Sequence, residues 1–137
     1  MNEGNFRPDF IGIGANKSGT TWVADMLQQH PEICLSEPKE VRYFNKVGAF
    51  KAENPSFNKE MNWYKRHFAH CRVGSIKGEF TSNYLGDKCA PEKIKASFPD
   101  VKLIVCLRNP IERAISHYNY WRYFFHREKR EFDEAVK

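Results

Sequence analysis

Short apolar runs alternate along the chain with segments in which apolar residues recur every three or four positions. The apolar runs predict strands over 9–14, 33–35, 73–79 and 103–107. The helical spacing predicts helices over 20–29 and 91–98, and a third is predicted by the spacing of Phe57, Met61, Tyr64 and Phe68. Segment 36–58 follows neither period and is expected to be irregular. Strands that alternate with helices are typical of an α/β fold, with a layered parallel sheet flanked by helices.

The last apolar run has an informative continuation. Leu103–Leu107 is unbroken, which is typical of a strand covered on both faces of a parallel sheet. Arg108 follows at the carboxyl end, where open α/β sheets bind ligands. Asn109 is expected to be the N-cap of the next helix, with Glu112 reaching back as in a capping box. Ser116 lies about two turns into that helix, so its hydroxyl is expected to face the same cleft as Arg108.

The first strand ends in a turn rich in small residues. Free backbone N–H groups and the helix dipole make the start of the following helix an anion site. The expected donors are Ser18, Gly19, Thr20 and Thr21, and Lys17 adds a positive charge. The P-loop of NTP-binding proteins has a glycine immediately before its lysine. Here Asn16 stands in that position and Gly19 follows the lysine, so the turn departs from that motif.

The string Lys17-Ser-Gly-Thr-Thr-Trp22 resembles the 5′-phosphosulfate loop of sulfotransferases that use 3′-phosphoadenosine 5′-phosphosulfate (PAPS). The stretch 102–118 resembles the 3′-phosphate motif of the same superfamily, in which an Arg and a Ser grip the phosphate. The resemblance implies that 17–22, including Trp22, bind the 5′ end of the nucleotide and that Arg108 and Ser116 bind its 3′-phosphate. PAPS would be the co-substrate and 3′,5′-ADP (PAP) the product, with no metal.

Domains of this superfamily are longer than this chain. The resemblance therefore implies that 9–137 is the N-terminal portion of a sulfotransferase domain, with an incomplete P-loop nucleotide-hydrolase-like fold, after a polar lead-in over 1–8.

The resemblance also implies catalytic roles. Lys17 is expected to contact the oxygen that bridges phosphate and sulfuryl group, where negative charge grows as the bond breaks. The segment Lys39-Glu-Val-Arg-Tyr-Phe-Asn45 is similar to a Glu-Val-His-Phe-Phe-like segment of heparan-type carbohydrate sulfotransferases. Glu40 is therefore the expected base. Arg42 stands where that branch usually has His.

A second carboxylate stays open as an alternative base. Glu79-Phe-Thr-Ser-Asn-Tyr84 is similar to a Glu-Lys-Ser/Thr-Pro-x-Tyr segment of those enzymes, with Phe80 in place of the lysine. Glu79 is either a second acid in the cleft or a carboxyl with structural hydrogen bonds.

Composition agrees with a nucleotide-binding domain. The 137 residues suffice for one domain with a core, and the net charge of +5 suits a polyanionic nucleotide. No nucleic-acid partner is expected, because basic and acidic residues are mixed and no helix-turn-helix or zinc-finger spacing occurs. Neither a signal segment nor a membrane-length apolar stretch is present, so a cytoplasmic protein without a membrane partner is predicted. The oligomeric state stays open.

The four cysteines stand far apart, without a C-x-x-C pair, and the five histidines show no metal-ligand spacing, so no metal site is expected. Cys34 and Cys106 lie in apolar runs and are expected to be buried free thiols. Cys71 and Cys89 are expected to pair only if the protein is secreted.

These patterns together predict a PAPS-dependent sulfotransferase. It would transfer a sulfuryl group to a hydroxyl or amine of an acceptor, carbohydrate-like or another small molecule. Two alternatives stay open. One is a domain that binds PAPS or PAP without turnover, and the other is a P-loop nucleotide kinase. The kinase is disfavoured by the order of lysine and glycine and by the lack of a clear acid ending an apolar strand.

Overall fold

The structure, a computed structural model, describes residues 6–48 and 52–137. Its strands are β1 (Phe10–Gly14), β2 (Ile33–Leu35), β3 (Ile76–Phe80) and β4 (Lys102–Val105). Its helices are α1 (Thr20–Gln28), α2 (Met61–Arg66), α3 (Ala90–Ser97), α4 (Pro110–Asn119) and α5 (Phe132–Ala135). A π-helical turn, Tyr120–Phe124, continues α4.

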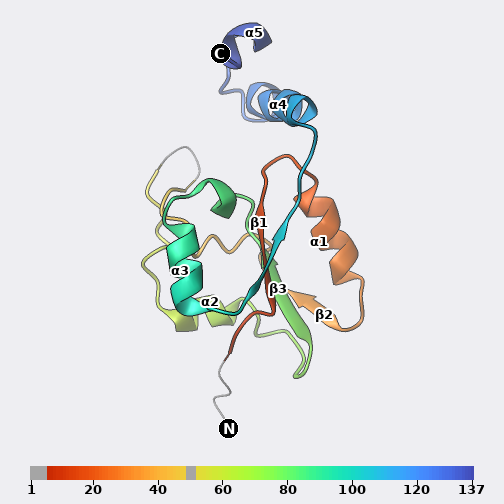
Figure 1. Ribbon diagram of the computed structural model, residues 1–137, viewed down its shortest axis with the longest axis vertical. Coiled ribbons are helices and arrows are strands. Elements are labelled where there is room, and N and C mark those ends of the chain that lie inside the picture. The colour runs from red at the N-terminus through yellow and green to blue at the C-terminus, as the bar shows by residue number, and fades with distance from the viewer. Residues whose placement is uncertain (1–5, 49–51) are drawn as a thin grey trace.

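The four strands form one parallel sheet in the order β2-β3-β1-β4. Phe10 of β1 is in register with Gly78 of β3 on one side and Lys102 of β4 on the other. Because the strands are parallel, the loops that follow β1, β3 and β4 leave the sheet on the same side, at the carboxyl ends of the strands (Figure 1). The parallel α/β fold predicted from the alternating pattern is confirmed.

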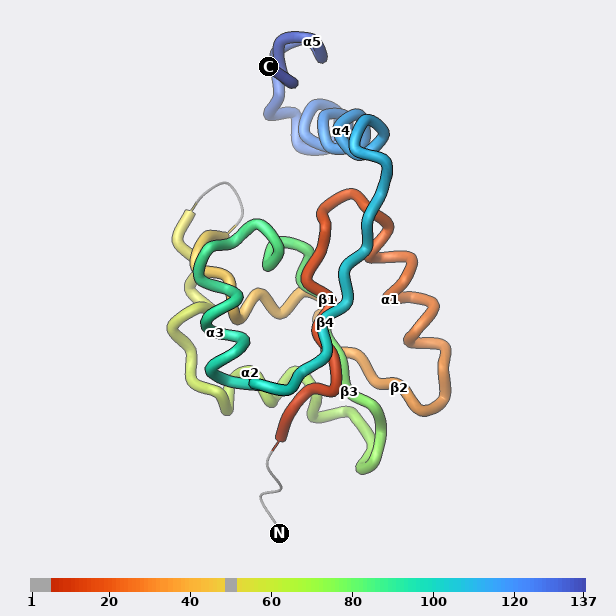
Figure 2. The backbone as a smooth tube through the Cα atoms, in the orientation of Figure 1, coloured from red at the N-terminus to blue at the C-terminus, as the bar shows by residue number. Residues whose placement is uncertain are grey.

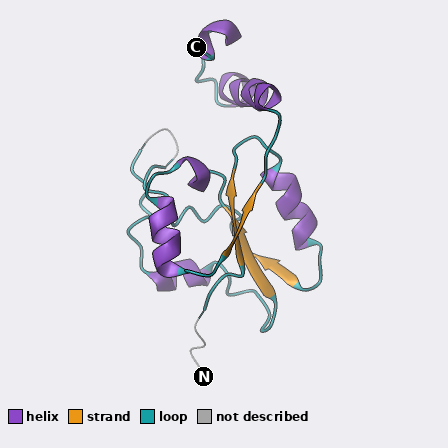
Figure 3. Ribbon diagram, in the orientation of Figure 1, coloured by secondary structure: helices purple, strands orange, loops and turns teal. Residues whose placement is uncertain are grey.

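Helices cover both faces of the sheet (Figure 3). Successive strand residues point to opposite faces, and β1 contributes to both layers. Phe10 packs in a buried cluster with Ala24 of α1 and Phe80. Its neighbour Ile11 belongs to the other cluster, with Tyr64 of α2 and Ile94 of α3 among its members.

Most predicted elements are present, with shifted boundaries. The third strand begins at Ile76 rather than at residue 73, and the helix expected around 57–68 is confined to Met61–Arg66. Segment 36–58 is irregular where the structure describes it, and residues 49–51 of it lie outside that part. Of the lead-in, residues 1–5 lie outside the description. Phe6, within the expected lead-in, packs against the core, and its ring lies 5.2 Å from that of Phe68.

The fourth strand differs from the prediction. β4 is at the edge of the sheet, and Leu103 and Val105 keep 52% and 44% of their surface exposed. The prediction that this strand is covered on both faces is therefore wrong for this chain. The chain then leads to α4 and α5, which lie beyond the carboxyl ends of β1 and β4 (Figure 2). No helix of the described part is both long and apolar enough to pass through a bilayer.

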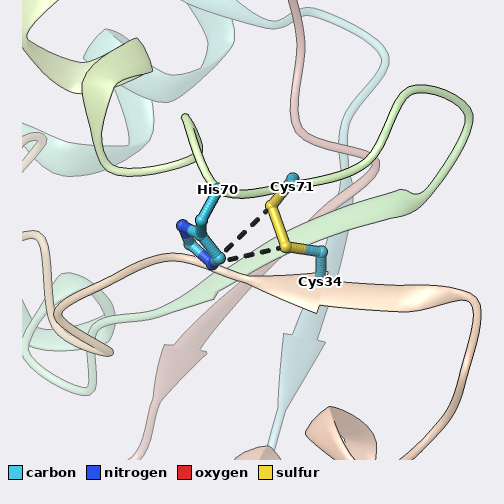
Figure 4. Close-up of side chains that lie close together, drawn as sticks. All are labelled: Cys34, His70 and Cys71. Atoms are coloured by element: carbon cyan, nitrogen blue, oxygen red, sulfur yellow. Dashed lines mark hydrogen bonds between the residues drawn. A yellow bond between two sulfur atoms is a disulfide. The ribbon is translucent and has the colours of Figure 1, made fainter.

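The cysteines pair differently from the expectation. Cys34 of β2 forms a disulfide with Cys71 (Figure 4). Cys89 and Cys106 are free. Cys34 is thus not a free thiol, and Cys71 does not pair with Cys89. His70 Nε2 lies 3.4 Å from Cys34 Sγ, so tertiary contact assembles a His/Cys group that linear spacing did not suggest. Both sulfurs are in the disulfide, so neither is a thiolate ligand for a metal.

Candidate active site

A cleft of about 1040 Å³ opens at the carboxyl ends of the strands. Its walls come from the turn after β1, the irregular segment after β2, the segment after β3, and Arg108 with α4 and the π-helical turn. Parallel strands bring these segments together although they are far apart in the sequence. Of the predicted site residues, Lys17, Gly19, Thr20, Thr21, Glu40, Arg108 and Ser116 line this cleft.

The turn after β1 has the backbone of an anion site. Gly19 precedes α1 with a φ of 83°, a conformation that favours glycine, and as the N-cap residue it has no side chain to offer the N–H groups of the first turn. The amide of Asn16 donates to Asn83 Oδ1 at 2.6 Å, which ties the turn to the segment after β3. Ser18 does not line the cleft, but its buried Oγ has no partner among the described residues. The N-cap of α1 therefore leaves the N–H groups of the first turn to other partners, and the Ser18 hydroxyl lies beside them in the chain.

Lys17 is held over an aromatic ring. Its Nζ lies 3.9 Å from the centre of the Tyr120 ring, a cation–π contact. Tyr120 opens the π-helical turn, and such turns often occur at functional sites. Trp22, by contrast, is 69% exposed and does not line the cleft, so nothing here supports it as a nucleotide contact.

Glu40 is an ionised carboxylate at the cleft wall. Ser82 Oγ donates to its Oε1 at 2.7 Å, and Arg42 donates to its Oε2 at 3.0 Å. Burial alone would raise the pKa of Glu40, but these hydrogen bonds outweigh it and hold the pKa below its usual value. Arg42, where the heparan-type segment has His, thus positions the expected base directly.

Arg108 and Ser116 both line the cleft. Asn109 Oδ1 accepts hydrogen bonds from the backbone N–H groups of Ile111 and Glu112, which confirms the predicted N-cap of α4. The predicted capping box is not formed. Glu112 instead accepts a hydrogen bond from Arg108 Nε at 3.2 Å.

Glu79 and Phe80 point into the protein rather than into the cleft. Glu79 is fully buried, and burial raises its pKa to about 8, so its carboxyl is neutral at pH 7. It is therefore not an acid of the cleft. The Phe80 ring packs over Gly12, where any Cβ would clash with it. Phe80 thus fills the core on the α1 side.

Sequence reasoning missed several residues of this cleft. Lys39, Ser82 and Asn83 line it and contact the turn or Glu40, and Tyr120 covers Lys17. Lys39 and Ser82 lie inside the two segments, 39–45 and 79–84, that resemble segments of the family, and this resemblance could have pointed to them.

Comparisons with known proteins agree with this architecture. The model of the sulfotransferase domain family matches residues 7–137. The membrane-associated sulfotransferase kil1 of Dictyostelium discoideum is 34% identical over 82% of this chain and 23% of its own length. Human heparan sulfate glucosamine 3-O-sulfotransferase 6 is 33% identical over 81% of this chain and 30% of its own length.

A solved structure is similar over nearly all of this chain. The crystal structure of a sulfotransferase from Alicyclobacillus acidocaldarius matches with a TM-score of 0.81 and 28% identity, covering 96% of this chain and 56% of that one. This chain therefore spans about half of that protein and less than a third of the two relatives. With a family model that matches almost its whole length, the chain belongs to the sulfotransferase domain family.

Proposed function

We propose that this protein binds PAPS and transfers its sulfuryl group to a hydroxyl or amine of an acceptor, releasing PAP. One observation carries the proposal. A single cleft brings together the turn with Lys17, the Arg108–Ser116 pair and the ionised carboxylate of Glu40. In this proposal they supply an anion site for each end of the nucleotide and a base for the acceptor.

The turn after β1 would hold the 5′-phosphosulfate, and Arg108 with Ser116 the 3′-phosphate. An arginine forms bidentate, charge-assisted hydrogen bonds with a phosphate, and a serine hydroxyl adds one donor. The Lys17 ammonium would stabilise the bridging oxygen more strongly as that oxygen gains charge.

Glu40 would take the proton of the acceptor. As the acceptor oxygen or nitrogen bonds to sulfur, the bond from sulfur to the bridging oxygen breaks, and its electron pair stays on the 5′-phosphate of PAP. The proton ends on Glu40, so charge and atoms balance. A depressed pKa keeps Glu40 ionised at neutral pH, as a base must be.

The acceptor is proposed to be carbohydrate-like and anionic. Several relatives carry heparan sulfate in their names, among them the 3-O-sulfotransferase 6 and an N-deacetylase/N-sulfotransferase. In the described part of the cleft, six cationic side chains face two carboxylates, which favours an anionic ligand. The cations are Lys17, Lys39, Arg42, Lys46, Lys88 and Arg108.

Calorimetry with PAP, 5′-AMP and ATP tests the binding step, and sulfate transfer to a panel of glycans tests turnover. PAP is expected to bind far better than 5′-AMP. Glu40→Gln is expected to lose most turnover with nearly unchanged PAP affinity, because it removes basicity but keeps shape. Tight PAP binding without turnover on any acceptor would favour the binding-only alternative, and a preference for ATP would favour the kinase.

The cytoplasmic location stays a prediction. The Cys34–Cys71 disulfide favours an oxidising compartment instead, because thiols are kept reduced in the cytosol. Localisation of the tagged full-length protein would decide between the two.

A further inference from the structure

Lys39 lies at the anion site, although it comes from a different segment. Its Nζ donates to Thr21 Oγ1 at 3.0 Å, and Thr21 belongs to the first turn of α1. The ammonium thus stands next to the helix N-terminus that lines the cleft, where the helix dipole is positive.

The backbone of Lys39 is anchored on both sides. Its carbonyl oxygen accepts hydrogen bonds from Ser36 Oγ at 3.2 Å and from the backbone N–H of Phe80 at 3.4 Å. Ser36 follows β2 and Phe80 ends β3, so the ends of these two strands fix the position of the Lys39 Cα. The fold therefore sets the position of the Lys39 backbone, and the hydrogen bond to Thr21 holds the ammonium.

The cations of the cleft differ in what they contact. Arg42 pairs with Glu40 and Arg108 with Glu112. Lys39 forms none of the ion pairs found among the described residues, and its hydrogen-bond partner is a neutral hydroxyl. Burial lowers its pKa, while Glu40 and Asp25 raise it from longer range. A partly desolvated cation without a close carboxylate gains most from a bound anion.

We propose that Lys39 is a second donor-binding cation, whose ammonium contacts the sulfuryl oxygens of PAPS while Lys17 contacts the bridging oxygen. This inference rests on the proposed function. In an in-line transfer the sulfur lies between the base and the leaving oxygen, hence between Glu40 and the turn after β1. Lys39 adjoins Glu40 in the chain and its ammonium contacts Thr21 of α1, so it connects the two segments that would flank the sulfur. Arg108 and Ser116 line the cleft from another element, since Arg108 precedes α4 and Ser116 lies within it.

Lys39→Met tests the proposal, because methionine keeps most of the length and apolar stem but removes the charge. Calorimetry without acceptor compares PAPS, which carries the sulfuryl group, with PAP, which lacks it. Loss of a charge-assisted hydrogen bond should weaken PAPS about tenfold or more. PAP should weaken by no more than about twofold, the scale of a solvated charge. Lys39→Arg should restore much of the PAPS affinity.

Lys46→Met is the matched control. It removes the same charge from the same cleft. General electrostatics predict equal, small losses for PAPS and PAP in this variant. The unfolding temperature of each variant is measured as well. A clear drop for Lys39→Met with equal losses of PAPS and PAP affinity would mean that Lys39 only holds Thr21 to the segment after β2.

The possible results separate the two proposals. If the unchanged protein binds neither nucleotide, the proposed function fails, and this inference fails with it. If it binds both and Lys39→Met weakens both equally, or Lys46→Met weakens PAPS as selectively, only the role of Lys39 is refuted.

Discussion

Arg108 is the residue whose replacement should separate PAP from 5′-AMP. The two nucleotides differ only in the 3′-phosphate, which we assign to Arg108 and Ser116. In the structure Arg108 Nε donates to Glu112 Oε2 at 3.2 Å, and the two side chains are 42% and 62% exposed. A bound 3′-phosphate would therefore replace an existing, solvated ion pair.

The size of the effect follows from these two contacts. A hydrogen bond between charged groups contributes about 1.5–3 kcal/mol, whereas an exposed pair four residues apart on a helix contributes about 0.3–0.5 kcal/mol. The difference is about 1–2.7 kcal/mol, so Arg108→Ala should weaken PAP about 5- to 90-fold. The affinity for 5′-AMP should hardly change.

Glu112→Gln provides the complementary test. It releases Arg108 from its partner, so PAP should bind about twofold more tightly, with 5′-AMP again unaffected. Calorimetry of both nucleotides against the unchanged protein and the two variants measures all six affinities. Equal affinities for PAP and 5′-AMP in the unchanged protein, or equal losses for both in Arg108→Ala, would refute the two-ended site.

Three further predictions concern ionisation and the disulfide. Arg42→Ala should raise the pKa of Glu40, since burial is then less opposed, and the acid limb of the pH–turnover profile should move to higher pH; an unmoved limb would exclude Glu40 as the titrating base. Glu79, with a pKa raised to about 8, stabilises the fold most fully below pH 4.5 and loses that contribution up to about pH 8. In Glu79→Gln the free energy of unfolding, measured by urea unfolding at several pH values, should decline less between pH 4.5 and about pH 8. The same decline with pH in both proteins would argue that Glu79 is ionised when folded. Cys34→Ser opens the loop closed with Cys71 across 37 residues, so the free energy of unfolding should fall by about 3–4 kcal/mol; labelling of all four thiols in the unreduced, denatured protein would contradict the disulfide.

Local features of the site were readable in the sequence. Asn109 caps α4 as predicted, because an N-cap depends only on its own side chain and the next few N–H groups. The turn after β1 was likewise recognisable, since a strand, a glycine and a helix start are adjacent in the chain. Arg108 lines the cleft as predicted, because residues that follow parallel strands lie together at the carboxyl ends of those strands.

Contacts between distant segments were not readable. The unbroken run Leu103–Leu107 overlaps strand β4, but an apolar run does not reveal which strands flank it, and β4 is at the edge. The pairing of Cys34 with Cys71 depends on how close β2 and the loop after α2 come in space. Glu79 could have pointed to either side, and burial decided that it is a neutral carboxyl of the interior.

By itself the sequence determined the parallel α/β class and the strand–turn–helix segment that we propose as an anion site. It also determined the order of Arg108 and Ser116 around the start of α4. Each of these depends on the order of nearby residues and on the spacing of apolar positions. Only the tertiary structure decided which side chains share the cleft. It brought Ser82 and Arg42 onto Glu40, which keeps that carboxylate ionised, and Lys39 onto Thr21. The electrostatics of the site depend on distances between side chains from separate strands, and those distances arise only when the sheet is assembled.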